Sequence, residues 1–580
     1  MSNSCSSERP VLRILTRGRL QMNGRERGFG TSLSQRGFEP NLGILAARLL
    51  SVRQWRQGAS MHTLKGYAGD SDERIAVPAS RTLRSARVAP VRRPTGRVGR
   101  RSCVQPRSRR VMRDESFLLL DPPSVSDFCR RGSLREKDNA RNSPFPNIDL
   151  ILLSGTIREA GFQPVFVDAQ LNRLSWADVT RQAREKGIRG VLSLVSSSRI
   201  QEELEALGQF KQAMGGIPCY IVGPIILQRE SLRLRRLFDE HPWLDGVVLN
   251  TTEHNLSEIL SGGADSVAPF NVAIRRDGAL TMPDVRVRYG DSLRLPQPEH
   301  AIFLDRRYCF PQSKRGPVTC VQFSFGCPFT CEFCIDNQLY RKMLYRDVDD
   351  MIDELVAIDR LGFREAYFKD LTFGLQKNVA VEFLRKLAER KLRLRWLCTT
   401  RVDVATRDML EMMKKAGCYG IEFGVEHADE AKRRSVDKRI KDERIREVFA
   451  DCRRLRISTT AFVMLAFEDD TQADVRATIR FARSLRPNYV SFNVVNALPG
   501  TPYYERAKRE GFLREGPSDY GFAGSNLKHR HLTSTQVERL RREALRSFYF
   551  QPSLILEKLL EVRSWFELRK LIRLGVGALS

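Results

Sequence analysis

Three cysteines in one short string, Cys327-Pro-Phe-Thr-Cys331-Glu-Phe-Cys334, have the spacing C-x3-C-x2-C. Their thiolates are soft ligands that suit zinc or an iron–sulfur cluster. A closed zinc site or a fully coordinated four-iron cluster takes four ligands, so three cysteines leave one iron of such a cluster open to another molecule. The spacing predicts a cluster with one open iron; a zinc loop and three ordinary thiols are the alternatives.

The residues before this loop, 318–325, are rich in β-branched and aromatic side chains and predict a strand. The cysteine loop therefore begins at the carboxyl end of a strand, where α/β barrels place their chemistry. Strand-like and helical patterns continue to alternate after the loop. They predict six βα units that form a partial barrel, open on one side, with further strands at 366–370, 394–398, 420–426, 459–465 and 489–494 and helices at 348–361, 378–390, 408–416, 441–455 and 472–484.

A similar alternation precedes the barrel. Short apolar runs at 117–121, 164–168, 190–195, 219–223 and 246–249 alternate with helical patterns at 148–160, 176–186, 200–214 and 227–238. Short buried strands that alternate with helices predict a parallel, doubly wound sheet. The predicted fold class is α/β, with a flavodoxin-like doubly wound domain, then a partial (β/α)6 barrel, then a helical C-terminal tail that starts at a capping signal in 532–536.

The cysteine motif and the six βα units together resemble the radical S-adenosylmethionine superfamily, and Phe333, just before the third cysteine, also fits that family. The resemblance implies that Cys327, Cys331 and Cys334 hold a [4Fe-4S] cluster whose open iron binds S-adenosylmethionine. In the family, one electron from the reduced cluster releases a 5′-deoxyadenosyl radical, which abstracts hydrogen from an unactivated carbon. An external one-electron reductant of the flavodoxin or ferredoxin type is implied as a partner.

Four further residues at predicted strand ends are candidate cofactor contacts. In the family, an acidic or polar group at the position of Asp370 meets the cofactor's amino group. Arg401 follows the third strand of the barrel. Glu422 and Glu426 lie four apart on the fourth strand, so both point to one face. The resemblance favours Glu426 as the ribose contact; the alternative is a structural charge paired with an arginine. No catalytic acid or base is assigned.

The first domain resembles the cobalamin-binding module of one subgroup of the superfamily. That subgroup includes anaerobic magnesium-protoporphyrin ester cyclases, hopanoid-modifying enzymes and C-methyltransferases. The similar features are Asp121–Pro123, the run that ends at Asp168, and the turn at 252–254. Two features depart from the module: no Asp-x-His-x-x-Gly is present, and Gly223-Pro224 stands where a double glycine is usual. The sequence leaves two possibilities for this domain: it binds cobalamin, or it only packs against the core.

Charge and composition set the remaining expectations. The net charge is +28, but residues 1–111 hold 23 Lys or Arg and only 6 Asp or Glu. This extension predicts either a wrongly assigned start before Met112, a disordered or transit segment, or a nucleic-acid-binding arm. Predicted boundaries are 1–112 for the extension, 116–265 for the cobalamin-binding-like domain, 266–316 for a connector, 317–515 for the core and 516–580 for the helical tail.

The predicted activity is modification of an unactivated carbon in a lipid, porphyrin-like or secondary-metabolite substrate, by C-methylation or by ring-forming or oxidative chemistry. Alternatives are a methylthiotransferase acting on RNA or protein, and an enzyme with a degenerate cobalamin domain. The dispersed early cysteines argue against the methylthiotransferase, and the charge count argues against nucleic acid as a partner. Residues 554–574 mix apolar and basic side chains, which predicts either a packed helical cap or peripheral membrane contact. Scattered thiols fit a reducing cytoplasm.

Overall fold

The computed structural model describes residues 115–123, 128–131, 134–137, 144–196, 200–222, 231–263, 268–276, 278–283, 293–336, 342–514, 524–562, 564, 567–569 and 571–572. All of these residues belong to one compact unit of the chain, Gln105–Ser580. The predictions for 1–112 and for Gly223-Pro224 therefore lie outside the described residues.

The first sheet has seven strands in the order β4-β1-β5-β6-β7-β8-β9. Its five parallel strands follow the order 2-1-3-4-5 along the chain, which is the flavodoxin order, so the predicted doubly wound sheet is confirmed. The central residues of β1, Phe117–Leu120, are all buried, which is what a strand covered by helices on both faces of the sheet requires. The strands are β1 (Ser116–Asp121), β4 (Gln163–Asp168), β5 (Ile188–Leu194), β6 (Cys219–Val222), β7 (Gly246–Val248), β8 (Val272–Arg276) and β9 (Ala279–Thr281).

The β8–β9 hairpin extends this sheet with antiparallel strands, so residues expected in the connector contribute to the first domain. Gly278, at φ +78°, lies in the turn between them, in a conformation that favours glycine. A separate hairpin joins β2 (Phe128–Arg131) to β3 (Leu134–Lys137). The helices of this region are α2 (Ile148–Glu159), α3 (Trp176–Glu185), α4 (Ile200–Ala213), α5 (Ser231–Glu240), α6 (Leu256–Glu258) and the short helix η1 (Ile259–Gly263).

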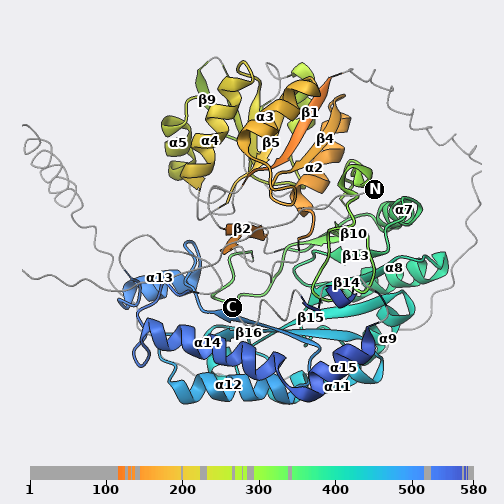
Figure 1. Ribbon diagram of the computed structural model, residues 1–580, viewed down its shortest axis with the longest axis vertical. Coiled ribbons are helices and arrows are strands. Elements are labelled where there is room, and N and C mark those ends of the chain that lie inside the picture. Colours follow the sequence, from red (N-terminus) through yellow and green to blue (C-terminus); the bar gives the residue numbers. More distant parts are fainter. Residues whose placement is uncertain are drawn as a thin grey trace, which may run out of the picture. The chain divides into compact units, whose positions relative to one another are not determined.

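The second sheet has six parallel strands in the order β10-β13-β14-β15-β16-β17, and its two end strands are not paired with each other. The predicted open, partial barrel is therefore confirmed (Figure 1). The strands are β10 (Val318–Val321), β13 (Glu365–Phe368), β14 (Arg395–Thr400), β15 (Cys418–Glu426), β16 (Ser458–Leu465) and β17 (Tyr489–Val494). The helices are α7 (Val348–Arg360), α8 (Lys377–Arg390), α9 (Arg407–Lys415), α10 (Glu430–Ser435), α11 (Asp442–Arg454), α12 (Gln472–Ser484) and α13 (Pro502–Arg509).

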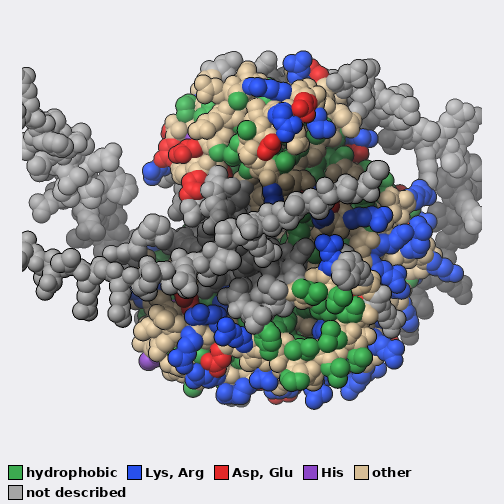
Figure 2. Space-filling view, viewed as in Figure 1, with side chains coloured by type: hydrophobic (Ala, Val, Ile, Leu, Met, Phe, Trp, Pro, Cys, Tyr) green, Lys and Arg blue, Asp and Glu red, His purple; other side chains and the backbone are tan. Residues whose placement is uncertain are grey.

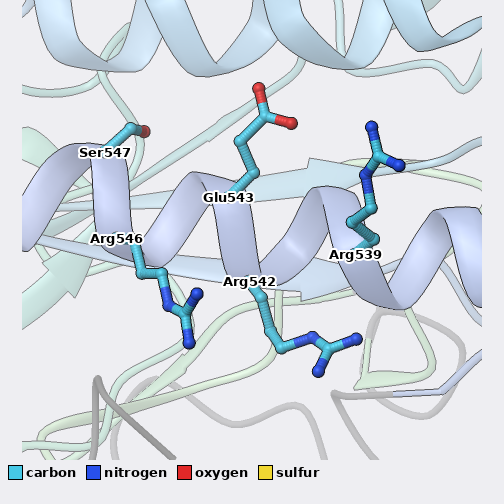
Figure 3. Close-up of a pocket in the computed structure, with 5 residues that line it drawn as sticks. All are labelled: Arg539, Arg542, Glu543, Arg546 and Ser547. Carbon is cyan, nitrogen blue, oxygen red and sulfur yellow. The ribbon is translucent and has the colours of Figure 1, made fainter.

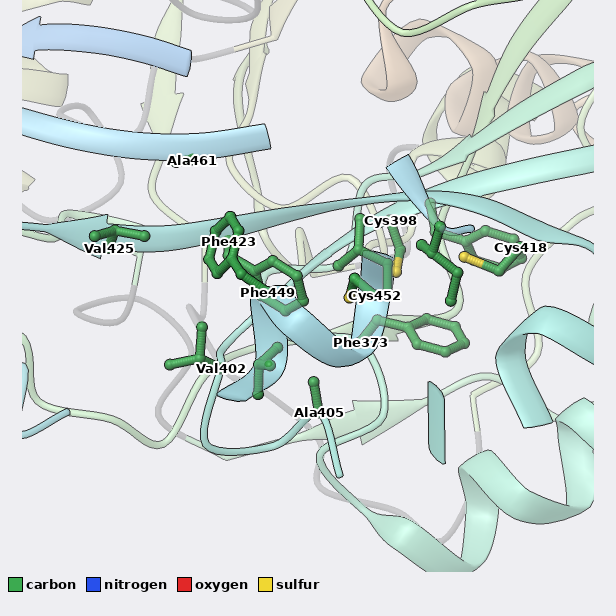
Figure 4. Packing of buried hydrophobic residues seen from close by; sticks show 14 of the residues in the cluster. Phe373, Cys398, Val402, Ala405, Cys418, Phe423, Val425, Phe449, Cys452 and Ala461 are labelled. Carbon is green, nitrogen blue, oxygen red and sulfur yellow. The ribbon is translucent and has the colours of Figure 1, made fainter. Parts of the chain in front are cut away.

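The core of this barrel lies between the sheet and its outer helices. Figure 4 shows Phe423 of β15 beside Phe449 of α11, and their ring centroids are 5.4 Å apart. Cys398, Cys418 and Cys452 are buried in the same apolar cluster. These three thiols are therefore core residues and not part of the candidate ligand set.

A buried ion-pair network fixes the connector to the barrel. His300 belongs to the short helix η2 (His300–Phe303), and its Nε2 lies 3.1 Å from Glu354 Oε1 on α7. Its Nδ1 lies 3.0 Å from the Thr319 hydroxyl on β10. Arg346 Nη2 lies 2.7 Å from Glu354 Oε2, and both side chains are buried. The three segments are thus held together by charge as well as by apolar packing.

The C-terminal region is helical, as predicted, with α14 (Ser534–Tyr549) and α15 (Pro552–Glu561). α14 begins with a reciprocal capping box between Thr533 and Gln536, which confirms the capping signal. Val537, Leu540, Ala544 and Phe548 form its buried face. Within the described part of the chain, no helix combines the length and the apolar character that crossing a bilayer requires.

Candidate functional site

The cysteine loop is shaped by hydrogen bonds to distant parts of the barrel. The Glu332 N–H donates to the Val436 carbonyl at 3.0 Å, and the Tyr503 N–H donates to the Glu332 carbonyl at 3.1 Å. Thr501 caps α13 and accepts from the Tyr504 N–H at 3.1 Å, so the Pro-Gly-Thr-Pro turn sets the position of the Tyr503 amide. This turn, which follows the last strand of the barrel, therefore also holds the loop.

The three candidate ligands lie close together on this loop. Cys331 is buried, whereas Cys327 and Cys334 are half-buried, and all three are free thiols. Among the described residues, no three His, Cys, Asp or Glu side chains converge on a point as they would around one metal ion. A cubane cluster offers each thiolate a different iron, so its ligands need not converge in that way. Three soft donors on a pre-shaped loop therefore fit a cluster better than a closed zinc site.

Arg401 lies directly beside the central cysteine. Its Nη1 is 3.6 Å from Cys331 Sγ, and its guanidinium stacks 3.6 Å from the centroid of the Phe329 ring. Two further nitrogens donate to the carboxylate of Asp403 at 2.9 and 2.7 Å, which fixes the orientation of the guanidinium. Burial raises the pKa of the Cys331 thiol, while the positive charges of Lys438 and Arg401 lower it. A cation held here favours the thiolate, the form that binds metal.

Lys438 was missed in the sequence and is part of the same cluster of charges. Its Nζ donates to Glu426 Oε1 at 2.9 Å, and both side chains are buried. Glu426 ends β15 with φ +66°, which turns the chain sharply. A Cβ on Gly424 would lie only 2.4 Å from Glu426 Oε1 and 2.6 Å from Lys438 Nζ, so a larger residue there would have to displace the ends of these two side chains. Glu426 is paired with a lysine, not with the arginine considered above; its ribose contact stays a prediction.

Asp370 holds the backbone that leads into the cysteine loop. Its two carboxylate oxygens accept the N–H groups of Phe323 and Ser324 at 2.9 and 2.8 Å, and the Ser324 hydroxyl also donates to it at 2.5 Å. These bonds turn the chain away from the sheet, so β10 ends at Val321 and the last part of the predicted strand instead forms β11 (Ser324–Phe325), paired with β12 (Leu344–Tyr345). Contact between Asp370 and the cofactor's amino group stays a prediction.

We expect Asp370→Asn to change how stability depends on pH. Burial raises the pKa of Asp370 from 3.8 to about 6, although its hydrogen bonds oppose this. Because the folded-state pKa is the higher one, its contribution to stability is greatest below the unfolded value and falls as pH rises through about 6. The stability of the wild type relative to the variant should therefore drop by about 2–3 kcal/mol between pH 4 and pH 7. Urea unfolding at both pH values measures this, and parallel curves for the two proteins would contradict it.

Glu422 lies four residues before Glu426 and deeper in the barrel. It accepts from the Tyr367 hydroxyl on one oxygen and from Gln312 Nε2 at 3.0 Å on the other. Tyr367 also lies 3.0 Å from the Thr399 hydroxyl, so neighbouring strands share one buried polar network. This arrangement accounts for Glu422 as a structural group, and its cofactor contact stays a prediction.

The loop also borders an apolar cluster and an acidic side chain. Phe333 packs against the apolar cluster that includes Val495 and Tyr503. The Tyr503 hydroxyl donates to Glu468, a residue at the end of the fifth strand that sequence reasoning did not single out. His427 is buried, and its Nδ1 accepts from the Asp429 N–H at 3.0 Å, so it is a hydrogen-bonded structural histidine.

The cysteine loop and the sheet around it match a known family. The model of the radical SAM superfamily matches residues 321–482. This chain carries a radical S-adenosylmethionine domain. A domain of this family works with a [4Fe-4S] cluster and S-adenosylmethionine, and the chain is an enzyme of this type.

Proteins related to this radical S-adenosylmethionine enzyme include methyltransferases and cyclases. An uncharacterized methyltransferase of Pyrococcus horikoshii is 24% identical over 78% of this chain and 96% of its own length. The anaerobic magnesium-protoporphyrin IX monomethyl ester cyclase of Cereibacter sphaeroides is 24% identical over 69% of this chain and 66% of its own length. Among solved structures, the cobalamin-dependent S-adenosylmethionine radical enzyme OxsB covers 80% of this chain and 72% of its own, with a TM-score of 0.57 at 14% identity.

Proposed function

We propose that this enzyme is a cobalamin-assisted radical S-adenosylmethionine C-methyltransferase that acts on an unactivated carbon of a small or lipid-like molecule. The observation that carries the proposal is the pairing of a sheet in flavodoxin order with a six-stranded radical S-adenosylmethionine sheet in one chain. The similarity to OxsB, which spans both regions, supports it. The match to a protoporphyrin ester cyclase makes ring formation the second candidate.

In this proposal, Cys327, Cys331 and Cys334 hold the cluster. When bound, the cluster supplies the electron that splits S-adenosylmethionine into methionine and a 5′-deoxyadenosyl radical. Arg401 stands at hydrogen-bond distance from Cys331, and the buried Lys438 adds a second positive charge that offsets negative charge on the thiolates.

In this proposal, cobalamin binds at the carboxyl edge of the first sheet. Parallel sheets of this order bind ligands at that edge. After β7, Asn250 Oδ1 accepts from the Thr252 N–H at 2.9 Å and from its hydroxyl at 2.8 Å, which shapes a polar turn. Burial lowers the pKa of His254 to about 4, so this imidazole is neutral at pH 7. Its Nδ1 accepts from the Leu256 N–H at 3.2 Å, so it serves the turn rather than a metal.

The proposed partners follow from the same chemistry. A one-electron reductant of the flavodoxin or ferredoxin type would reduce the cluster, and a reducing cytoplasm would keep the thiols available. Nine cysteines whose side chains the structure describes, from Cys219 to Cys452, are free thiols, as a reducing compartment would leave them.

The test is anaerobic reconstitution with iron, sulfide and hydroxocobalamin, followed by gel filtration. We expect the protein to retain cobalamin, measured by its visible absorption, and to form 5′-deoxyadenosine or a methylated product from S-adenosylmethionine. Thr252→Trp, which fills the edge of the first sheet, should lower bound cobalamin and leave iron content unchanged. Wild-type protein that keeps its cluster but retains no cobalamin would show that the first domain only packs against the core.

A further inference from the structure

Helix α15 exposes large apolar side chains to water, which is unusual for a surface helix of a globular protein. Its exposed side chains include Leu556 at 59%, Leu559 at 54%, Leu560 at 75% and Ile555 at 41% of their full accessible area. At about 100° per residue, these four side chains span one arc of about 140°. A surface helix normally turns such an arc toward the core.

The opposite side of α15 faces the body of the protein. Leu554 packs against the barrel core, and Lys558 Nζ lies 4.9 Å from the centroid of the Tyr489 ring. Lys558 also pairs with Glu561 at 3.1 Å. The contacts of Leu554 and Lys558 turn this side of α15 toward the barrel, which leaves the apolar arc outside.

Helix α14 carries a row of arginines on its outer side. Arg539, Arg542 and Arg546 are spaced i, i+3 and i+7, opposite the buried face, and line a shallow hollow (Figure 3). Arg542 and Arg546 point away from Glu543, which binds Arg476 at 3.1 Å instead. Within the described residues, no carboxylate pairs with these three arginines.

The arginine row and the apolar arc lie on consecutive helices, because α14 ends at Tyr549 and α15 begins at Pro552. Figure 2 shows hydrophobic side chains gathered over the region of α15, with Lys and Arg side chains beside and around them. Residues 530–580 carry ten Lys or Arg against five Asp or Glu. An apolar face with a basic border is the combination that lies in the boundary of an anionic bilayer.

We propose that the outer face of α14 and α15 docks on an anionic lipid surface. The apolar arc enters the boundary between headgroups and acyl chains, and Arg539, Arg542 and Arg546 contact lipid phosphates. A second copy of the chain fits this face poorly, because a symmetric contact would bring two arginine rows together. Neither helix crosses the bilayer, so the contact is peripheral and reversible.

The test uses the full chain, sedimented with vesicles of phosphatidylcholine alone or with added phosphatidylglycerol. We expect binding only to the anionic vesicles, and weaker binding as salt rises. Arg539→Gln/Arg542→Gln/Arg546→Gln should lower the partition coefficient roughly a hundredfold, since each basic residue near such a surface contributes about fivefold. Leu556→Gln/Leu559→Gln/Leu560→Gln should lower it by at least roughly tenfold.

Leu304→Gln/Leu361→Gln is the matched control, because these leucines are similarly exposed elsewhere and should bind as the wild type does. Circular dichroism checks that each variant is folded. The proposal is overturned if the wild-type protein does not bind anionic vesicles, or if the leucine variant binds them as strongly as the wild type does. It is also overturned if the wild type is a dimer that the leucine changes convert to a monomer, because the face would then be an interface between copies.

Discussion

Cys331→Ala is expected to reduce cluster content after anaerobic reconstitution to background and to abolish formation of 5′-deoxyadenosine. Of the three thiols, Cys331 is the buried one, and it lies 3.6 Å from Arg401 Nη1. Removing it leaves two thiols, too few to retain a four-iron cluster on this loop. Iron and sulfide analysis, visible absorption and chromatography of the products measure the result.

Cys320→Ala is the matched control for that experiment. Cys320 lies in β10, fully buried in the apolar core and only a few residues before the loop. It should keep both cluster and activity, because no predicted ligand is lost. If Cys320→Ala lost the cluster while Cys331→Ala kept it, the assignment of the three ligands would be wrong.

Glu354→Gln is expected to destabilise the protein by about 3–5 kcal/mol at pH 7, because it leaves the buried Arg346 guanidinium without a counter-charge. Burial alone would raise the pKa of Glu354, yet Arg346 and His300 together lower it to about 2. Since this folded-state pKa is depressed, the stabilisation is present above the unfolded value near 4.5 and is lost as pH falls toward 2. Urea unfolding at pH 7 and at pH 3 measures both effects.

Glu389→Gln provides the comparison, because Glu389 pairs with Arg385 at 2.6 Å on the exposed face of α8. The loss of stability caused by Glu389→Gln should stay below about 1 kcal/mol. The double variant Glu354→Gln/Arg346→Met should recover part of the stability lost by the single change, since no unpaired charge then remains buried. A single variant as stable as the wild type would show that the network does not contribute.

The sequence predicted the strands and helices well because their patterns are local. The barrel strands are short runs in which most side chains are buried, from Val318 to Val321 in β10 to Tyr489 to Val494 in β17, as a covered parallel strand requires. The end of β10 was placed too late because it depends on Asp370, a residue far along the chain that accepts the Phe323 and Ser324 amides. No local sequence pattern reveals these hydrogen bonds between Asp370 and the two amides.

The candidate site was predicted less completely for the same reason. The three cysteines share one string, so their spacing was sufficient to find them. Lys438 lies in a run of charged residues, and nothing in that run shows that its side chain is buried against Glu426. The connection between Tyr503 and the loop joins two motifs whose sequences reveal no contact.

That connection sets an order for making the enzyme. The loop that carries the three thiols is closed by α13, whose residues are translated long after the cysteines have left the ribosome. Until β17 and α13 have folded, the nascent chain exposes its thiols on an unshaped segment, open to oxidation and to stray metal ions. We therefore expect the loop to accept iron and sulfide fully only once the barrel is finished, and oxygen exposure during synthesis to lower the yield of active enzyme more than the same exposure afterwards.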